Sequence, residues 1–542
     1  MRRRVKVAMG IAALALAMIP VGRPASSAPT PTWQSIPAAP GDPGAMFLLT
    51  NGQVLVSDQG PSNAGSPGWW LLSPSASGSY VDGTWSAAAS LPAGYGPLYF
   101  ASGVLPDGRV IIEGGEFNGT STFAAVNQGA IYDPTTGTWS PVAPPGGGTG
   151  CWSTIGDAPS VVLADGTFLL GASGTRASTC AALFDAASTS WTATGAGKGD
   201  PNPEEGFTLL PDGRVLDVNT GGTPTVLGGV RTAELYDPTT GTWSPAGDTP
   251  SPLDNGDGEI GPATLMPDGT VFAEGATAAT ALYDPSTGTW SAGPAMPTVA
   301  GQQLNAADAC SAVLPDGSVL FNASPNMGPG THWFTFDGSA ITQVPDDAAL
   351  PSSSETSNLC NALVLPDGQV MVNVRSGPTP IELYTPSGSP DPSWAPTVST
   401  APHAVAAGHP YAIQGTQFGG LDEGAYFGDD YNPQSNYPLV RLRNRATGRV
   451  TYARTSGSTG LSVAPGTPGS TTVTLPPSAV DGPSTLRVVV NGIASAPWSV
   501  TVTGGAPPAR PRHLVTLTCV RGTAVRHLRA THPRCPAGWR RR

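Results

Sequence analysis

Charged side chains, helical periodicity and membrane-spanning apolar runs are all scarce in this 542-residue sequence. Only 12% of the residues are charged, and no stretch repeats apolar residues at the spacing of an amphipathic helix. After residue 28 no apolar run is long enough to cross a bilayer, so we expect a soluble mature chain. The 70 glycines and 58 prolines punctuate short apolar runs, a composition typical of β proteins.

Cysteine is also sparse, and its spacing argues against metal binding. The sequence has six cysteines but no Cys-x-x-Cys motif and no neighbouring pair of histidines, the patterns that zinc sites use. Six cysteines allow fifteen connectivities in principle, and three local disulfides are the simplest choice in an exported protein. The pairs would be Cys151 with Cys180, Cys310 with Cys360, and Cys519 with Cys535.

Residues 1–28 have the pattern of a secretory signal peptide. Arg2, Arg3, Arg4 and Lys6 precede an apolar run over residues 7–19, and small residues at 25–28 suit cleavage. The basic cluster matches the twin-arginine pattern only loosely, which favours the general export route. We therefore expect a secreted or extracellular protein.

Charge is divided unevenly along the chain. Residues 505–542 hold nine arginines and no acidic residue, whereas residues 29–504 hold 12 basic and 38 acidic residues, a net charge of −26. That sign disfavours nucleic-acid binding by the body and is compatible with cations or neutral polysaccharides. The basic two-cysteine tail (504–542) could bind an anionic cell envelope, fold back on the body, or stand as a solvated appendage.

One motif occurs seven times between residues 46 and 394. An apolar run, a turn ending in Asp-Gly or Asn-Gly and a second apolar run follow one another, with turn glycines 56, 58, 47, 56, 48 and 51 residues apart. In five of the seven repeats an aromatic residue followed by Asp comes next. The Asp-Gly pair should supply the positive φ angles of a tight hairpin. Four short strands per repeat, recurring about every 50 residues, predict a seven-bladed β-propeller over residues 29–398. The turn glycines are Gly52, Gly108, Gly166, Gly213, Gly269, Gly317 and Gly368.

Aromatic residues recur in register with the turns and should pack between blades. The expected pairs are Tyr132 with Trp139, Phe184 with Trp191, Tyr236 with Trp243, Tyr283 with Trp290, and Tyr384 with Trp394. Either Trp33 or Trp394 could belong to the strand that completes the last blade. The adjacent Trp69 and Trp70 do not recur, and strand alternation would aim them at opposite faces, leaving one for stacking on a sugar.

Residues 399–503 differ from the repeats and predict a separate antiparallel sandwich of the immunoglobulin-like type. Arg441 and Arg443 alternate with apolar residues and should share one exposed strand face. With Arg445, Arg449, Arg454 and the nearby Asp429-Asp430 they form a charged patch. Docking against the acidic propeller is the favoured role of this patch, and recognition of a partner is the alternative.

A secreted kelch-type propeller followed by an early-set immunoglobulin-like domain resembles the galactose oxidase and glyoxal oxidase group. The resemblance implies one copper held by two tyrosines and two histidines, with one tyrosine cross-linked to a cysteine. The matching positions here are Ala101, Asp157, and either Ala307-Asp308 or Asn358-Leu359, and the stretch 426–431 contains no histidine. The body retains only His332, His403 and His409. We therefore expect a member of the fold without copper.

Carboxylates stand seven or eight residues before the turn in five of the repeats. These positions open the innermost strands and should converge on one mouth of the central channel, where carboxylate oxygens suit Ca²⁺ rather than copper. They are Asp42, Asp157, Glu204, Glu259 and Asp308, and Asp254 and Asp257 would join Glu259 in a calcium site. An acidic body also shows acids in its loops without any such site.

Two classes of function follow from these features. The favoured one is a secreted, monomeric, non-catalytic protein that binds carbohydrate or cell-envelope components through an acidic, calcium-compatible channel mouth. The alternative is an enzyme, either a diverged copper radical oxidase or a carbohydrate-active enzyme that uses paired carboxylates.

Overall fold

The computed structural model describes residues 30–60, 63–174, 178–194, 197–221, 229–256, 258–350, 355–374, 380–424, 434–507, 515–530 and 533–542. Almost all regular structure in these residues is β-strand, which confirms the all-β prediction. The helical segments found in the described ranges are four single turns, η1 (Pro145–Gly147), η2 (Gly150–Trp152), η3 (Ser357–Leu359) and η4 (Pro392–Trp394). The expected signal peptide lies outside the described residues.

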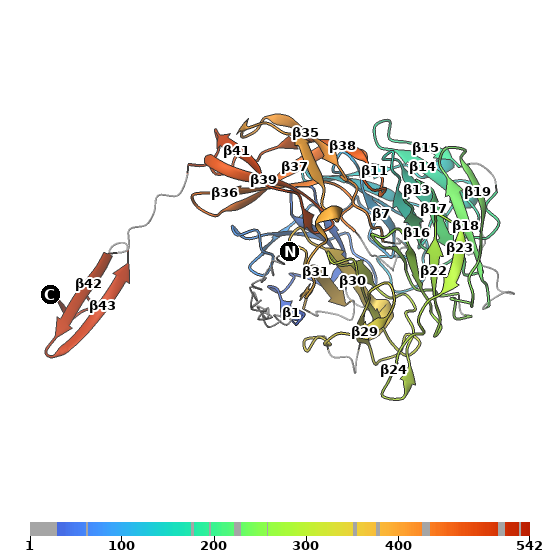
Figure 1. Ribbon diagram of the computed structural model, residues 1–542, viewed down its shortest axis with the longest axis horizontal. Helices are drawn as coiled ribbons and strands as arrows, with labels where there is room; N and C mark the ends of the chain where they lie inside the picture. Colours follow the sequence, from blue (N-terminus) through green and yellow to red (C-terminus); the bar gives the residue numbers. More distant parts are fainter. Residues whose placement is uncertain are drawn as a thin grey trace, which may run out of the picture.

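Seven separate antiparallel sheets of four strands each follow one another along the chain (Figure 1). Sheet 1 contains β2 (Pro43–Leu48), β3 (Val54–Asp58), β4 (Trp69–Ser73) and β5 (Thr84–Ala87). Sheet 2 contains β7 (Ala101–Val104), β8 (Val110–Glu113), β10 (Gly129–Asp133) and β11 (Thr138–Val142). Sheet 3 contains β12 (Ser160–Val162), β13 (Phe168–Gly171), β14 (Ala181–Asp185) and β15 (Ser190–Ala193).

The remaining four sheets repeat this order of strands. Sheet 4 contains β16 (Phe207–Leu209), β17 (Val215–Val218), β18 (Thr232–Asp237) and β19 (Thr242–Asp248). Sheet 5 contains β20 (Ala263–Leu265), β21 (Val271–Glu274), β22 (Thr280–Asp284) and β23 (Thr289–Ala292), and sheet 6 contains β26 (Ser311–Val313), β27 (Val319–Ala323), β28 (His332–Phe336) and β29 (Ile341–Gln343). Sheet 7 contains β30 (Cys360–Val364), β31 (Val370–Val374), β32 (Glu382–Thr385) and β1 (Thr32–Ser35).

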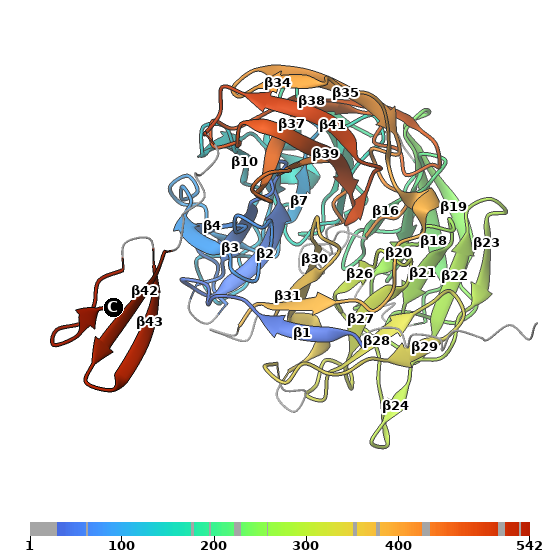
Figure 2. The same cartoon turned by 60° about the vertical axis from the view of Figure 1, so that its left-hand side comes forward.

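The seven sheets form a closed ring around a common centre (Figure 2). In sheets 2 to 6 the first strand contacts the first strand of the following sheet, and β30 of sheet 7 contacts β2 of sheet 1. Sheets 1 and 2 are joined by a shared apolar cluster that contains Phe47, Trp69 and Phe100. Each sheet thus buries its faces against its two neighbours, which a single four-stranded sheet could not do alone.

An N-terminal strand closes the ring. β1 pairs with β32, which sets Trp33 opposite Tyr384 with ring centroids 4.9 Å apart. The Trp33 indole N–H also donates to the carbonyl of Pro345 at 2.7 Å. Trp394 lies in η4 instead, where its ring occupies the space beside Gly317. The predicted pair of Tyr384 with Trp394 is therefore wrong, and Trp33 completes sheet 7.

All seven hairpin turns between first and second strands share one geometry. Each turn glycine has a φ between 80° and 90°, whereas none of the residues before these glycines has a positive φ among the described residues. The prediction that both turn residues have positive φ is thus wrong for the first. That side chain instead accepts a hydrogen bond from the backbone N–H two residues on, as in Asp107 to Arg109 (3.0 Å) and Asp268 to Thr270 (2.9 Å).

Tryptophans of the outer strands fasten neighbouring sheets together. Five indole N–H groups donate to a backbone carbonyl near the end of the preceding sheet's outer strand, at 2.7–3.2 Å. The donors are Trp33, Trp85, Trp139, Trp191 and Trp290. Sheet 6 has no tryptophan there, and the indole nitrogen of Trp243 in sheet 4 has no hydrogen-bond partner within the described part of the chain. The contact between sheets 3 and 4 therefore does not use an indole-to-carbonyl hydrogen bond.

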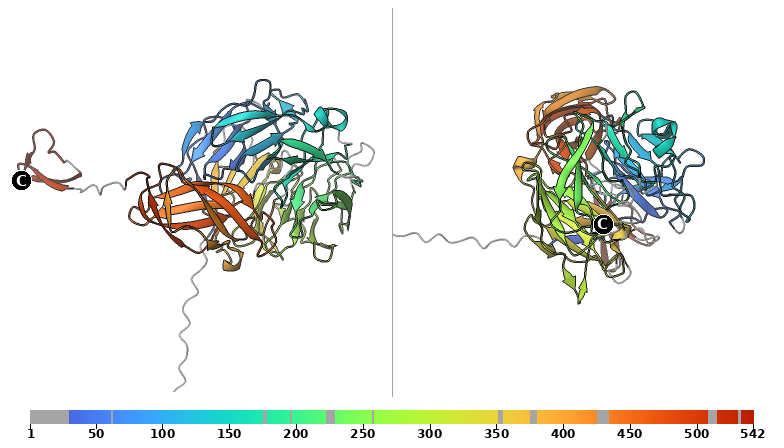
Figure 3. Two further views of the ribbon diagram at one scale, coloured as in Figure 1. Left: turned by 90° about the horizontal axis from the view of Figure 1, so that it is seen from above. Right: turned by 90° about the vertical axis from the view of Figure 1, so that its right-hand side faces the viewer.

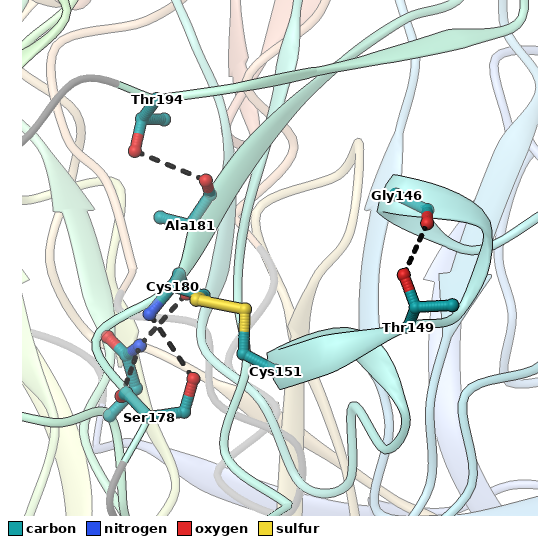
Figure 4. The surroundings of a disulfide bond; sticks show 8 residues. Gly146, Thr149, Cys151, Ser178, Cys180, Ala181 and Thr194 are labelled. Atoms are coloured by element: carbon teal, nitrogen blue, oxygen red, sulfur yellow. Dashed lines mark hydrogen bonds between the residues drawn. A yellow bond between two sulfur atoms is a disulfide. The ribbon is translucent and has the colours of Figure 1, made fainter.

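The three disulfides join the cysteines that the sequence analysis paired. Cys310–Cys360 links the starts of the first strands of sheets 6 and 7, and Cys519–Cys535 lies in the tail. Cys151–Cys180 ties η2 to the residue before β14 (Figure 4). Two of the three disulfides therefore reinforce the ring.

Residues 397–503 form a C-terminal unit packed against the ring (Figure 3). Its long strand β37 (Val450–Thr459) pairs with β38 (Pro468–Thr474) on one side and β36 (Leu439–Asn444) on the other. An apolar cluster including Ile413, Val440 and Val500 fills the space between its strands. The other strands are β33 (Thr397–Thr400), β34 (Ala404–Ala406), β35 (Pro410–Thr416), β39 (Gly482–Val490), β40 (Ile493–Ala494) and β41 (Trp498–Thr503).

Several small sheets complete the described structure. The tail sheet contains β42 (Val515–Arg521), β43 (Ala524–Ala530) and β44 (Arg540–Arg541). Two short strand pairs accompany the ring, β6 (Pro97–Leu98) with β9 (Phe117–Asn118) and the hairpin of β24 (Thr298–Val299) with β25 (Gln302–Gln303). Among the described residues no helix has the length and apolar character needed to cross a membrane.

The closure of the ring can be tested with two tryptophan substitutions. We expect Trp33→Ala to lower the free energy of unfolding by about 2 kcal/mol, because it removes a hydrogen bond and a half-buried aromatic contact. Trp394→Ala serves as the control and should cost less, since η4 is outside the paired strands. Guanidinium unfolding followed by fluorescence measures both; a larger loss for Trp394→Ala would contradict closure by β1.

Candidate functional site

The first strands give the ring two distinct ends. The seven turns define the turn end, and the segments that lead into the first strands define the loop end. Hydrogen bonds from the C-terminal unit reach the turn end, including Thr50 Oγ1 to the Thr455 carbonyl (2.8 Å) and Ser458 N to the Pro106 carbonyl (2.9 Å). The loop end is thus the face opposite the one against which the C-terminal unit packs.

The segments at the loop end are fastened to the sheet before them. Gly115 N donates to the Gly156 carbonyl at 2.9 Å, which joins sheet 2 to the segment entering sheet 3. Ser173 Oγ and Asn373 Nδ2 make the equivalent bonds from sheets 3 and 7, to the carbonyls of Pro203 and Gly44 (both 2.7 Å). These bonds fix the positions of the carboxylates that the segments carry.

All five predicted mouth carboxylates lie in these segments, but with different exposure. Asp157, Glu204 and Asp308 are buried, and each interacts with other groups of the protein. Asp42 and Glu259 are half-buried. The structure therefore brings the five to one end of the ring, where Asp42 and Glu259 present the most accessible surface.

Glu259 and Asp308 lie in neighbouring segments that are bonded to each other. Asp308 N donates to the carbonyl of Ile260 at 3.0 Å, so sheets 5 and 6 approach each other next to Glu259. Asp308 itself has a φ of 47°, an unusual value for a residue with a side chain. On the far side of the ring, Asp42 N donates to Asp58 Oδ1 at 3.3 Å.

Of the three proposed calcium ligands, Asp254 and Glu259 belong to the described residues. Asp254 is buried, and desolvation raises the pKa of its carboxyl. Asn255 N donates to the Glu259 carbonyl at 3.1 Å, which closes the loop, whereas Asp257 lies outside the described residues. Within the described part of the chain, no group of three or more His, Cys, Asp or Glu side chains is arranged to hold a metal ion.

Trp69 and Trp70 point to opposite faces of β4. Trp69 is 2% exposed and packs 4.8 Å from Trp139, between sheets 1 and 2. Trp70 is half-buried, and a side chain added at Gly41 would meet its indole nitrogen. Of the two, only Trp70 retains surface on which a ligand could stack.

Between sheets 3 and 4 the structure contains a buried ionic cluster that the sequence analysis missed. Lys198 Nζ lies 2.5 Å from Asp217 Oδ2, 3.1 Å from Glu234 Oε2 and 3.3 Å from Glu205 Oε1. The four side chains are between 0 and 7% exposed. The ammonium also lies 4.8 Å from the Trp243 ring centroid, where the neighbouring sheets have an indole-to-carbonyl bond.

In this cluster one cation faces three carboxylates, and the pKa values of Lys198, Glu205 and Asp217 are all shifted. Burial would lower the pKa of Lys198, but the three carboxylates, led by Asp217, outweigh it and raise that pKa. Desolvation raises the pKa of both Glu205 and Asp217, while Lys198 opposes the rise. Backbone N–H groups of Gly199 and Thr220 donate to Glu234 (2.7 Å) and Glu205 (3.2 Å). The cluster therefore holds more carboxylates than cations and joins sheet 4 to the segment before it.

Two further buried carboxyls occupy equivalent places in sheets 2 and 5. Glu113 and Glu274 each follow their turn glycine by five residues and end the second strand. Desolvation raises the pKa of each well above its usual range. In the sequence, each of these buried carboxyls could have been recognised as a charged residue inside an apolar strand run. The same holds for Asp217 and Glu234.

A segment of the C-terminal unit enters the centre of the ring from the turn end. Tyr437 Oη donates to the Leu48 carbonyl of sheet 1, and Ser435 Oγ to the Val364 carbonyl of sheet 7 (3.0 Å). The Gln434 amide joins Val313 N of sheet 6 to Asp422 Oδ1, at 2.9 and 3.1 Å. A cavity of about 40 Å³ remains between this segment and β2, β7 and β12, room for little more than a water molecule. Residues 425–433, which include Asp429 and Asp430, lie outside the described residues.

The charged patch of the C-terminal unit faces the turn end in part. Arg441 and Arg443 alternate with the buried Val440 and Leu442 on β36, as predicted. Asp367, at the turn of sheet 7, keeps an exposed surface; desolvation by the surrounding protein raises the pKa of its carboxyl, and the nearby Arg441 guanidinium opposes that rise. Arg441 thus supports docking of the C-terminal unit on the ring.

In the described chain, other residues occupy the positions that the resemblance would assign to copper ligands. Ala101 opens β7 where a cross-linking cysteine would stand, and Asp157 replaces the tyrosine. His332 is on β28 with its Nδ1 2.7 Å from Asp346, while His403 stacks on Trp498 in the C-terminal unit, 5.0 Å between centroids. These imidazoles are held in separate elements and do not form the two-histidine, two-tyrosine set.

Comparison with known proteins gives distant structural similarity only. The chain is similar to a fungal alcohol oxidase of the AA5 family in complex with copper, with 16% identity, a TM-score of 0.49, and coverage of 88% of this chain and 100% of that one. It is also similar to the extracellular domain of a putative hybrid two-component system from B. thetaiotaomicron, with 11% identity and a TM-score of 0.44, covering 86% of this chain and 61% of that one. No protein-family model matches the sequence, and no curated protein matches it.

Substitution of the single buried cation tests the ionic cluster. We expect Lys198→Met to lower the free energy of unfolding by about 3 kcal/mol at about pH 8, because it leaves buried carboxylates unpaired. The loss should shrink towards about pH 5. Glu205 and Asp217 have folded-state pKa values above their unfolded values, so their stabilisation is complete at low pH and falls as pH rises; without Lys198 those pKa values rise further.

Arg214→Met is the matched control for the loss of one positive charge. Arg214 pairs with Asp212 at 2.6 Å in a partly exposed position, where ion pairs contribute little. Unfolding of both variants and the parent would be compared by calorimetry across this pH range. An equal loss for Lys198→Met at both ends of the range would contradict the expected protonation of Glu205 and Asp217 in the variant.

Proposed function

We propose that the ring is a seven-bladed, kelch-like β-propeller and that the C-terminal unit is an immunoglobulin-like domain of the early-set type. Seven four-stranded antiparallel sheets in sequence order, closed by an N-terminal strand, support the first assignment. Strands arranged around a shared apolar core support the second. On this basis the protein resembles the galactose oxidase-like group in architecture.

The function we assign is binding rather than catalysis. We expect a secreted protein that takes up carbohydrate or cell-envelope components at the loop end, with Ca²⁺ as a candidate cation. The observation that carries this proposal is that the loop end, opposite the C-terminal unit, gathers five carboxylates, two of them partly exposed. Carboxylates bind sugar hydroxyl groups and hard cations, and Trp70 offers a partly exposed ring nearby in sheet 1.

The three disulfides are in keeping with an oxidising, extracellular environment. The proposed export depends on residues 1–28, whose pattern is that of a signal peptide. Amino-terminal sequencing of the secreted protein would locate the cleavage.

Titration calorimetry of the secreted protein with calcium chloride tests the loop end. We expect binding by the parent, and an affinity at least about tenfold lower in the double variant Glu259→Gln with Asp308→Asn, because two oxygen ligands become neutral. Asp268→Asn, an exposed carboxylate at the turn end, is the control and should leave the affinity unchanged. Absence of heat in the parent would remove Ca²⁺ from the proposal.

Repeating the titration with neutral oligosaccharides, and with Trp70→Ala, then tests the carbohydrate proposal directly.

The enzymatic alternative has its own test. After incubation with copper, the parent should release no hydrogen peroxide from simple alcohols, aldehydes or galactose, because the donor set is missing. Stoichiometric copper together with enzyme-dependent peroxide would overturn the assignment as a binding protein.

A further inference from the structure

The tail sheet concentrates positive charge on a small folded element. Residues 505–542 contain nine arginines and no acidic residue. Seven of these arginines are in the described residues, and all seven are exposed, namely Arg521, Arg526, Arg529, Arg534, Arg540, Arg541 and Arg542. The remainder of the chain after residue 28 carries a net charge of −26. The tail is therefore a cationic surface on an anionic protein.

One face of the tail sheet is occupied by the chain itself. Leu517 and Cys519 of β42 are buried, and Cys519 is bonded to Cys535. The Trp539 ring lies 5.5 Å from the Arg521 guanidinium and 5.1 Å from that of Arg526. This covered face contains the core that holds the three strands together.

The opposite face remains accessible. Pairing of β42 with β43 sets Thr516 opposite Arg529 and Thr518 opposite His527, and pairing with β44 sets Val520 opposite Arg540. Thr516, His527, Arg529 and Arg540 are exposed, and Thr518 Oγ1 lies 3.0 Å from His527 Nδ1. We call this the open face; it combines guanidinium groups with hydroxyl and imidazole groups, and Val520 and Val525 lie on it as well.

We infer that the open face of the tail sheet binds a linear phosphodiester polymer of the cell envelope, of the polyol-phosphate type. Guanidinium groups donate paired hydrogen bonds to phosphate oxygens, and hydroxyl and imidazole groups add further donors. Strands about 4.8 Å apart place side chains at intervals over which a flexible polymer can adjust its phosphates. The inference rests only on the extracellular location in the proposed function and uses a different surface.

The structure favours this polymer over other polyanions. Single-stranded nucleic acid is held by bases stacked on aromatic rings, but the tail's only aromatic residue, Trp539, is packed under Arg521 and Arg526. A stiff duplex would bring many phosphates close to the acidic body. A membrane surface would require apolar side chains to insert, and in the described tail the one large apolar side chain that is strongly exposed is Val525.

Titration of the full-length protein with poly(glycerol phosphate) at about 50 mM salt tests the inference. We expect binding that weakens steeply with salt. The double variant Arg529→Gln with Arg540→Gln should lower the affinity by about tenfold and make the slope of log K against log salt shallower by about 1.4, the value for two lost phosphate contacts. The variant Arg521→Gln with Arg526→Gln removes the same charge from the covered face and should bind more tightly than the open-face variant.

Four outcomes would overturn the inference. These are no binding by the parent, equal losses in the two double variants, tighter binding of a single-stranded oligodeoxynucleotide of equal charge, and tighter binding of phosphatidylglycerol vesicles. Resistance of Cys519–Cys535 to mild reduction would confirm that each variant keeps the tail fold. The loop-end variant Glu259→Gln with Asp308→Asn should bind the polymer normally, so failure of the calcium or carbohydrate proposal remains distinguishable from failure of this one.

Discussion

The pairing of β1 with β32 is the constraint on which the rest of the structure depends. It joins residues 32–35 to residues 382–385 through a four-residue register and completes the last sheet of the ring. Only a closed ring gives every sheet two neighbours, and only then do the first strands surround a common centre that can receive the segment around Tyr437. The position of the C-terminal unit at the turn end, and hence the accessibility of the loop end, follows from that closure.

The contacts between sheets show how one repeat tolerates different chemistry. In most sheets an indole N–H reaches a carbonyl of the preceding sheet, a neutral bond that costs little to bury once satisfied. At sheet 4 the same space contains Lys198 with three carboxylates. A buried ion pair is expensive to desolvate, so this contact depends on protonation in a way that the indole contacts do not. Glu204, one residue from Glu205 of the cluster, is itself buried at the loop end.

Local rules predicted most of the fold and little of the site. The spacing of Gly52 to Gly368, with apolar runs on both sides, was sufficient to predict seven four-stranded repeats, because turn geometry and strand alternation are local. The partner of Tyr384 was not predictable in the same way, since Trp33 is more than 300 residues distant and Trp394 is nearer in sequence. All five predicted carboxylates lie in the segments that lead into the first strands, and their role as a binding site stays a prediction. Burial separates Asp157, Glu204 and Asp308 from Asp42 and Glu259, and burial depends on packing across sheets. Lys198 was missed because a single lysine has no periodic signal.

Closure by the first strand also sets an order of events during synthesis. Trp33 emerges from the ribosome long before Tyr384, and at about 5–20 residues per second the interval between them is roughly 20–70 s. Throughout that interval the outer edge of β32 does not yet exist, and the earlier sheets lack a closed ring. Contacts so distant in sequence also slow folding. The strand that completes the molecule is therefore the one that must wait longest for its partner, which makes the nascent chain dependent on protection of Trp33 and of unpaired sheet edges until the repeats are complete.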